Sequence, residues 1–264
     1  MVENLCKYDA RMDWSVSNKC NFQCAYCINP NKDFISNNLE KPSRIDIEKA
    51  VEAINKTKKT FLINITGGGE PFFVPNLIDF CEQISKNHFI SITSNLVLMD
   101  AEEFCKKINP NKVYFIIAST HLKELEKSKF IDKFVKNFLK LKKNGFNISA
   151  VEIAYPPLKK DLKKYKDYLK ENGIELTFNP FFGFYNNKKY PDSYTDKEIK
   201  LFGLNPLCRD SYNTKFRLCN AGYNYIQAYT NGDIYYCTML PKSLGNLYNE
   251  VIFNKKLIKC PVET

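Results

Sequence analysis

The stretch "MDWSVSNKCNFQCAYCINP", residues 12–30, joins a strand-like run to a loop that holds three cysteines. Its first six residues alternate apolar and polar side chains, as a half-buried strand does. The loop then places Cys20, Cys24 and Cys27 at spacings of four and three residues, with Tyr26 just before the last. A structural zinc site usually has four ligands in two close pairs, which this spacing does not provide. Three thiolates on one short loop fit a cubane iron–sulfur cluster whose fourth iron lacks a protein ligand.

The composition describes a globular chain of 264 residues with 44% hydrophobic residues, enough for one large core or a main domain with a small appendage. It has no run of eighteen apolar residues and no secretory signal, so we expect a soluble cytoplasmic protein. In that reducing compartment, ten cysteines favour metal binding or redox work over disulfides. The net charge of +10 rests on lysine, since only four of 39 cationic residues are arginine. This favours a solvated basic surface over a nucleic-acid groove.

Strand-length runs alternate with helical patterns through the first two-thirds of the chain. Six such units predict a parallel α/β sheet, either open and doubly wound or a partial barrel, because a full barrel needs eight. In either arrangement the chemistry belongs at the carboxyl ends of the strands, where the cysteine loop lies. We expect strands at residues 12–17, 60–66, 89–94, 112–119, 147–155 and 174–180, and helices at 43–57, 75–87, 100–109, 121–145 and 158–173.

The pattern changes after about residue 181. Residues 181–207 are rich in aromatics, Gly, Pro and Asn and contain at most one short helix, so we interpret them as a bridge between a core at 1–180 and a small unit at 208–264. Within that unit, Asn231-Gly232 lies between two alternating runs, a strong hairpin signal. The final stretch "EVIFNKKLIKC" (250–260) is amphipathic and predicts a short helix.

A second motif, "TGGGEPF" (66–72), directly follows the second predicted strand. Gly67, Gly68 and Gly69 allow the backbone to approach a ligand closely, and Glu70 offers a carboxylate to an ammonium group. With the C-x3-C-x2-C motif about forty residues earlier, the sequence resembles the radical S-adenosylmethionine (radical SAM) family.

The resemblance implies a partial (β/α)6 TIM-like barrel and two cofactors, a [4Fe–4S] cluster and S-adenosylmethionine. Cys20, Cys24 and Cys27 would bind the cluster, and the open iron would chelate the methionine moiety, whose amino group the Gly-Gly-Glu turn helps to hold. An electron from the cluster would split the sulfonium to give a 5′-deoxyadenosyl radical. That electron requires the low end of the cluster potentials, and so an external donor such as flavodoxin or ferredoxin.

Further site residues follow from their positions in the family pattern. Ser94 and Asn95 end the third predicted strand and Ser119 ends the fourth, where the family contacts ribose and carboxylate, and Tyr26 would lie beside the adenine. His121 follows the fourth strand and is a candidate acid or base, or else a residue of a helix cap. Glu152 interrupts an apolar strand, facing either the barrel interior or a helix, and needs a partner in both cases.

The last quarter of the chain carries a second set of cysteines, Cys208, Cys219, Cys237 and Cys260. The series "CNAG…NGDIYYC…LGN" resembles the auxiliary-cluster appendage called twitch and the first half of the larger SPASM appendage. The resemblance implies a second iron–sulfur cluster on Cys219, Cys237 and Cys260. The usual pair of cysteines near the end is missing, so Cys208 completes the cluster, one iron stays open, or the sequence stops short of further ligands. A zinc site on all four cysteines is the alternative.

We therefore expect an enzyme that abstracts a hydrogen atom from a small polar substrate, sugar-like or aminocyclitol-like, and dehydrogenates or epimerises it. Only about a dozen residues precede the first strand, which leaves little room for a leader-recognition domain. A SPASM-type peptide-modifying maturase is the alternative within the same chemistry. A zinc-stabilised binding protein without catalysis is the alternative from another class.

Overall fold

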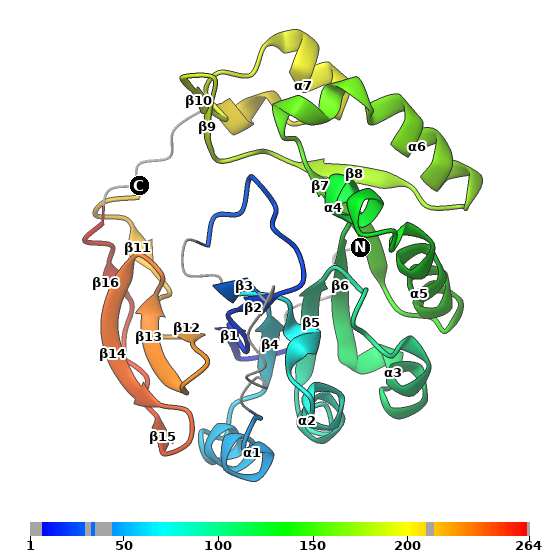
Figure 1. Cartoon of the computed structure of the whole chain (residues 1–264). Coiled ribbons are helices and arrows are strands. Elements are labelled where there is room, and N and C mark those ends of the chain that lie inside the picture. Colours follow the sequence, from blue (N-terminus) through cyan, green and yellow to red (C-terminus); the bar gives the residue numbers. More distant parts are fainter. Residues whose placement is uncertain (1–6, 30–32, 35–43, 210–213, 263–264) are drawn as a thin grey trace, which may run out of the picture.

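The computed structural model describes residues 7–29, 33–34, 44–209 and 214–262. Its centre is a ten-stranded sheet in the order β15-β14-β13-β12-β1-β4-β5-β6-β7-β8. The six strands from β1 to β8 are parallel neighbours and curve into an open barrel, as predicted (Figure 1). They are β1 (Ala10–Trp14), β4 (Phe61–Ile65), β5 (Phe89–Ser94), β6 (Val113–Ser119), β7 (Ile148–Ile153) and β8 (Leu176–Asn179).

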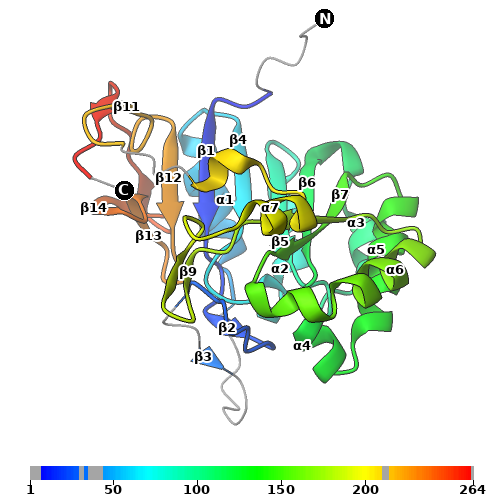
Figure 2. The same cartoon turned by 90° about the horizontal axis from the view of Figure 1, so that it is seen from above.

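The helices lie along the outside of this curved sheet (Figures 1 and 2). The single helix expected at 121–145 is two helices, because the backbone breaks at Lys129, whose φ is 60°. Gly145 and Gly173 follow the ends of their helices with φ of 82° and 71°, the left-handed conformation that favours glycine at the C′ position. The helices are α1 (Ile47–Lys56), α2 (Leu77–Ile84), α3 (Ala101–Lys107), α4 (Leu122–Lys127), α5 (Ile131–Lys143), α6 (Leu162–Glu171) and α7 (Asp196–Phe202), with short 3-10 turns η1 (Pro71–Phe73), η2 (Pro110–Lys112), η3 (Pro156–Lys160) and η4 (Pro206–Arg209).

The two faces of the barrel sheet differ in burial. Trp14 of β1 packs edge to face on Phe80 of α2, with 5.0 Å between ring centroids, so this face turns toward the helices. Along β5, residues on the same face are fully buried, whereas the alternating Ser91 and Thr93 are only half-buried. Because side chains alternate along a strand, the half-buried residues share the inner face of the barrel. This inner face therefore stays accessible to solvent.

The C-terminal strands extend the same sheet. The strand β12 (Tyr225–Ala228) pairs in parallel with β1, so β1 lies between β12 and β4. The predicted hairpin is confirmed, since β12 and β13 (Asp233–Cys237) are antiparallel and Gly232 in the turn has a φ of 84°. The strands β14 (Leu240–Asn246) and β15 (Glu250–Val251) continue the antiparallel edge.

The helix predicted at 250–260 is wrong. The stretch instead contributes β15 and β16 (Ile258–Lys259), which pair with β14 and with β11 (Leu218–Cys219). Pairing with neighbouring strands satisfies the backbone groups of a segment too short to form a stable helix on its own.

The bridge holds the expected short helix, α7, and also an unpredicted hairpin of β9 (Gly183–Tyr185) and β10 (Lys188–Tyr190). The strands β2 (Lys19–Cys20) and β3 (Asp33–Phe34) form a small parallel pair. Within the described ranges, no helix has the length and apolar character needed to cross a bilayer.

Candidate active site

The two sequence motifs meet at the carboxyl ends of β1 and β4. The Gly69 N–H donates to the Ser17 carbonyl oxygen at 2.5 Å, and the Glu70 N–H donates to that of Lys19 at 2.7 Å. A Cβ on Gly68 would lie 2.2 Å from the Ser17 oxygen, and one on Gly69 would lie 1.9 Å from the Lys19 oxygen. The glycines are therefore required for close packing of the Gly-rich turn on the chain that leads into the cysteine loop.

Glu70 is buried at the centre of this contact, with 3% of its surface exposed. Its carboxylate accepts hydrogen bonds from the Ser94 hydroxyl at 2.6 Å, the Asn95 N–H at 2.8 Å and the Phe72 N–H at 3.3 Å. Burial raises the pKa of Glu70 to about 7, and the three hydrogen bonds oppose that rise. The structure thus brings together three of the predicted site residues, and the carboxyl group titrates near neutral pH.

Asn95 also connects Glu70 to the cysteine loop. Its side-chain amide donates to Asn21 Oδ1 at 2.8 Å, while its own Oδ1 accepts from the Val97 N–H at 3.0 Å, which fixes the orientation of both amides. Asn21 Nδ2 is buried and has no hydrogen-bond partner among the described residues. A buried donor without a partner costs about 1–3 kcal/mol, so this N–H is suited to an acceptor on a bound group. Asn21 was not predicted as a site residue.

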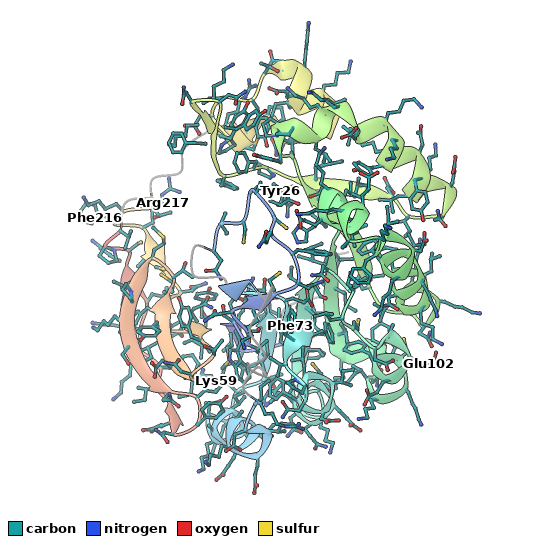
Figure 3. The ribbon with its side chains drawn as sticks, in the orientation of Figure 1. Tyr26, Lys59, Phe73, Glu102, Phe216 and Arg217 are labelled. Atoms are coloured by element: carbon teal, nitrogen blue, oxygen red, sulfur yellow. The ribbon has the colours of Figure 1, made fainter. Side chains whose placement is uncertain are left out.

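On the other side of the loop, Tyr26 reaches the ends of β6 and β7 (Figure 3). Its hydroxyl donates to Glu152 Oε1 at 2.8 Å and lies 2.9 Å from His121 Nδ1. Because the phenol has a single hydrogen, His121 must donate from Nδ1 to the Tyr26 oxygen. Burial and then the charge of Glu152 raise the pKa of Tyr26 well above its ordinary value, so it stays a neutral phenol. The Tyr26 ring also packs on Tyr155, with 5.3 Å between centroids.

Glu152 lies on the helix-facing side of β7, because it alternates with the inner-face residue Val151. Its carboxylate accepts four hydrogen bonds, so of the two orientations left open by the sequence, the paired and helix-facing one is correct. Besides the Tyr26 hydroxyl, the donors are the Thr120 hydroxyl at 3.0 Å, the Leu122 N–H at 2.6 Å and the Ile153 N–H at 2.8 Å.

The three loop cysteines lie within eight residues of chain. The Gly-rich turn holds the loop on one side, and the Tyr26–Glu152 contact holds it on the other. Cys20 and Cys24 are half-buried and Cys27 is exposed. The Cys27 N–H donates to the Cys24 carbonyl oxygen at 3.1 Å, which closes a tight turn, and the Phe22 N–H points at Cys20 Sγ at 3.5 Å. In the described residues no three Cys, His, Asp or Glu side chains already converge on one point as metal ligands. Ser119 is half-buried on the inner face at the end of β6.

Of the second set of cysteines, the structure aligns two on one ladder. Cys219 ends β11, and the Cys260 N–H donates to the Arg217 carbonyl oxygen at 2.9 Å, so Cys219 and Cys260 are diagonal neighbours on one face. Cys237 ends β13 in the large sheet, and Cys208 lies in η4. All four are half-buried.

The two histidines differ in their surroundings. His121 begins α4 in a left-handed conformation, with φ of 40°, between the rings of Phe22 and Tyr26. His88 is a structural residue: it is buried, its Nδ1 accepts from the Phe61 N–H at 3.2 Å, and its Nε2 lies 3.0 Å from Asn55 Oδ1. Burial and the nearby charge of Lys112 lower the pKa of His88 to about 4.

The chain has curated relatives and solved structural neighbours of several kinds. A GTP 3′,8-cyclase of Clostridium perfringens (strain 13 / Type A) is 26% identical over 211 residues, which are 73% of this chain and 62% of that protein. The chain thus spans less than two-thirds of the length of this curated relative.

Among solved structures, anSMEcpe with bound AdoMet matches with a TM-score of 0.60 and 18% identity, covering 92% of this chain and 78% of that one. The same protein has also been solved with AdoMet and the Kp18Cys peptide. SuiB of Streptococcus suis, bound to its precursor peptide SuiA, matches with a TM-score of 0.55 and 15% identity, covering 92% of this chain and 63% of that one. At these identities the likeness shows the fold alone.

The sequence model of the Radical SAM superfamily matches residues 14–164, which is more than half of the chain and includes both motifs. These residues run from the end of β1 through the cysteine loop, the Gly-rich turn and the Tyr26–Glu152 contact. This protein therefore belongs to the radical SAM superfamily.

Proposed function

We propose that this protein is a radical SAM enzyme that abstracts a hydrogen atom from a small polar substrate, sugar-like or aminocyclitol-like, and dehydrogenates or epimerises it. Radical SAM enzymes use a [4Fe–4S] cluster and S-adenosylmethionine and need an external electron donor. The cluster, when bound, supplies the electron that cleaves S-adenosylmethionine. We also propose a cytoplasmic location, since a reducing compartment keeps cysteines as thiols that can bind iron.

The residues at the barrel mouth fit these two groups. Cys20, Cys24 and Cys27 offer three thiolates on a loop anchored on both sides, and the buried Asn21 N–H offers a donor that has no acceptor among the described residues. Glu70, in its ionised form, offers a negative charge to the ammonium group of the methionine moiety. Ser94 and Asn95 orient this carboxylate through their hydrogen bonds, and they remain candidate contacts of the cofactor.

The observation that carries the substrate class is a polar row on the inner face of the barrel. The strand registers place Gln227, Asp13, Asn64 and Ser91 side by side across β12, β1, β4 and β5. Asp13 accepts from Arg11 Nε at 2.7 Å and from Asn64 Nδ2 at 3.0 Å, and the last three residues of the row are half-buried. A wall of amide, hydroxyl and carboxylate groups recognises a substrate rich in hydroxyl or amino groups better than an apolar one.

A peptide-modifying activity is the second candidate. Phe182 and Phe184 in the bridge expose 61% and 75% of their surfaces, which offers apolar side chains that a peptide could cover. Solved relatives of similar fold contain peptides, as in SuiB bound to SuiA.

We further propose that residues 208–264 form an auxiliary unit that binds a second iron–sulfur cluster on Cys219, Cys237 and Cys260, with Cys208 as a fourth candidate ligand. The same-face arrangement of Cys219 and Cys260 supports this ligand set. His121 remains a candidate acid or base, with its Nδ1 at the Tyr26 hydroxyl.

Metal counting and cofactor cleavage test the proposal. After anaerobic reconstitution, about eight irons per chain indicate two cubane clusters and about four indicate one, whereas zinc without sulfide contradicts the cluster assignment. We expect the protein to release 5′-deoxyadenosine from S-adenosylmethionine and dithionite. Cys24→Ala should abolish this release, and Cys81→Ala, which changes a buried packing cysteine, should retain it.

The substrate class is tested by isotope transfer. Deuterated sugars, aminocyclitols and peptides are supplied separately, and 5′-deoxyadenosine is examined for deuterium. Transfer from a polyhydroxylated compound supports the first candidate. Transfer from peptides alone contradicts it and supports the second.

A further inference from the structure

We propose that Glu152 is a positioning residue that holds the cysteine loop in its cluster-binding conformation through Tyr26. The inference rests on the proposed role of Cys20, Cys24 and Cys27 as cluster ligands, and it adds a residue from β7 that contributes no ligand itself.

Glu152 is fixed before it meets the loop. It is 2% exposed, and three of its four donors come from rigid parts of the barrel wall: the Thr120 hydroxyl, the Leu122 N–H at the start of α4, and the Ile153 N–H. A buried carboxylate is tolerated in an apolar strand only when its lone pairs are satisfied in this way. The fourth donor, the Tyr26 hydroxyl, comes from the cysteine loop.

Tyr26 lies between Cys24 and Cys27 in the chain, so fixing its side chain restricts the backbone that carries both thiols. Two further contacts act on the same segment. His121 Nδ1 lies 2.9 Å from the Tyr26 oxygen, and the Gln23 N–H donates to Glu124 Oε2 at 3.1 Å. Both partners come from the start of α4, so the middle of the loop is held from this side of the barrel.

The opposite side of the barrel holds the ends of the loop. The Gly-rich turn contacts the chain before Cys20, and Asn29 Nδ2, just after Cys27, donates to the Gly68 carbonyl oxygen at 2.7 Å. The Tyr26–Glu152 contact therefore restrains the middle of the cysteine loop, which the Gly-rich turn does not contact. A loop ordered before the metal arrives loses less conformational entropy on ligation, and an ordered loop releases a cluster more slowly.

The test compares iron retention in reconstituted protein under a chelator challenge. Tyr26→Phe removes only the hydroxyl, Glu152→Gln removes the charge, and the double variant removes both. We expect each single variant to lose iron about tenfold faster than the parent, equivalent to about 1.4 kcal/mol. The double variant should lose iron no faster than the single variant with the larger effect. In these variants, the electron paramagnetic resonance spectrum of the reduced cluster with S-adenosylmethionine should also differ from that of the parent.

A matched control is available on α4, the helix that also carries Glu124. Glu126 on α4 accepts from the Tyr165 hydroxyl and from Lys164, both of which lie on α6 and outside the cysteine loop, so Glu126→Gln breaks a similar contact elsewhere. This variant should retain iron and its resonance spectrum like the parent.

Three outcomes overturn the inference: parent-like iron retention in Tyr26→Phe, single effects that multiply in the double variant, or an equal effect of Glu126→Gln. Because phenylalanine keeps the ring packing, Tyr26→Phe decides the question even if Glu152→Gln fails to fold. Failure of the cluster assignment is separate, since it would appear as full iron retention in Cys24→Ala.

Discussion

Ionisation of Glu70 should cost the folded protein stability as the pH rises. The buried carboxyl has a pKa of about 7, against 4.5 in the absence of burial. Between these two values the folded chain keeps the proton that the unfolded chain releases, so the free energy of unfolding falls as the pH increases. A difference of about 2.5 pH units at about 1.36 kcal/mol each amounts to about 3 kcal/mol.

The parent protein masks this effect because His88 acts in the opposite direction. The pKa of His88 is lowered to about 4 by burial and by the charge of Lys112, so the unfolded chain takes up a proton that the folded chain refuses. Its contribution, about 3 kcal/mol by the same arithmetic, is lost as the pH falls from about 6.5 to about 4. These two contributions nearly cancel, so neither is visible by itself in the pH profile of the parent.

In Glu70→Gln, the contribution of His88 to the pH dependence of stability should become visible. The amide does not titrate, so between pH 7 and pH 4 we expect the variant to lose about 3 kcal/mol more stability than the parent. The assay is urea unfolding at a series of pH values on protein without cluster or S-adenosylmethionine, because bound groups break two-state behaviour. Parallel pH profiles for the two proteins would refute the reasoning, whatever their offset in absolute stability.

Two further predictions concern the packing around the site. Gly69→Ala should destabilise the protein by about 3 kcal/mol and abolish S-adenosylmethionine binding, because its Cβ would lie 1.9 Å from the Lys19 carbonyl oxygen. The control is Gly173→Ala, which has open space around it and a φ of 71°. It should lower the free energy of unfolding, measured with urea, by only about 1 kcal/mol. Equal costs would show that the Gly-rich turn has room to relax. Trp14→Phe removes the hydrogen bond of 3.1 Å from the indole to the Tyr229 carbonyl oxygen and should lower the free energy of unfolding by about 1–3 kcal/mol, an effect that an unchanged urea midpoint would contradict.

The barrel could be predicted from sequence because its signals are local. Alternating and apolar runs of strand length mark β5 at 89–94 with the observed bounds, and glycines mark the ends of α5 and α6. The helix predicted at 250–260 failed because its pattern was shaped by two partner strands, one of which is separated from it by about forty residues of chain. Periodicity within a short window cannot carry that information.

The site shows the same division. The positions of the cysteine and Gly-rich motifs after consecutive strands predicted their proximity, since parallel strands end at one edge. What the sequence could not provide was the identity of their contacts. The glycines approach the backbone of residues 17–19, and Glu152 is paired with a tyrosine 126 positions earlier. The one available signal was a carboxylate within an apolar strand, which demands a partner without naming it.

The placement of β1 between β4 and β12 has a consequence for biosynthesis. As the chain leaves the ribosome, β1 can pair with β4 early, but its other edge stays bare until Tyr225–Ala228 has been made. The segment that leads into the cysteine loop is therefore completed by residues that are translated long after it. Metal loading and the final stage of folding are thereby coupled, so nascent or truncated chains lacking β12 should mature poorly.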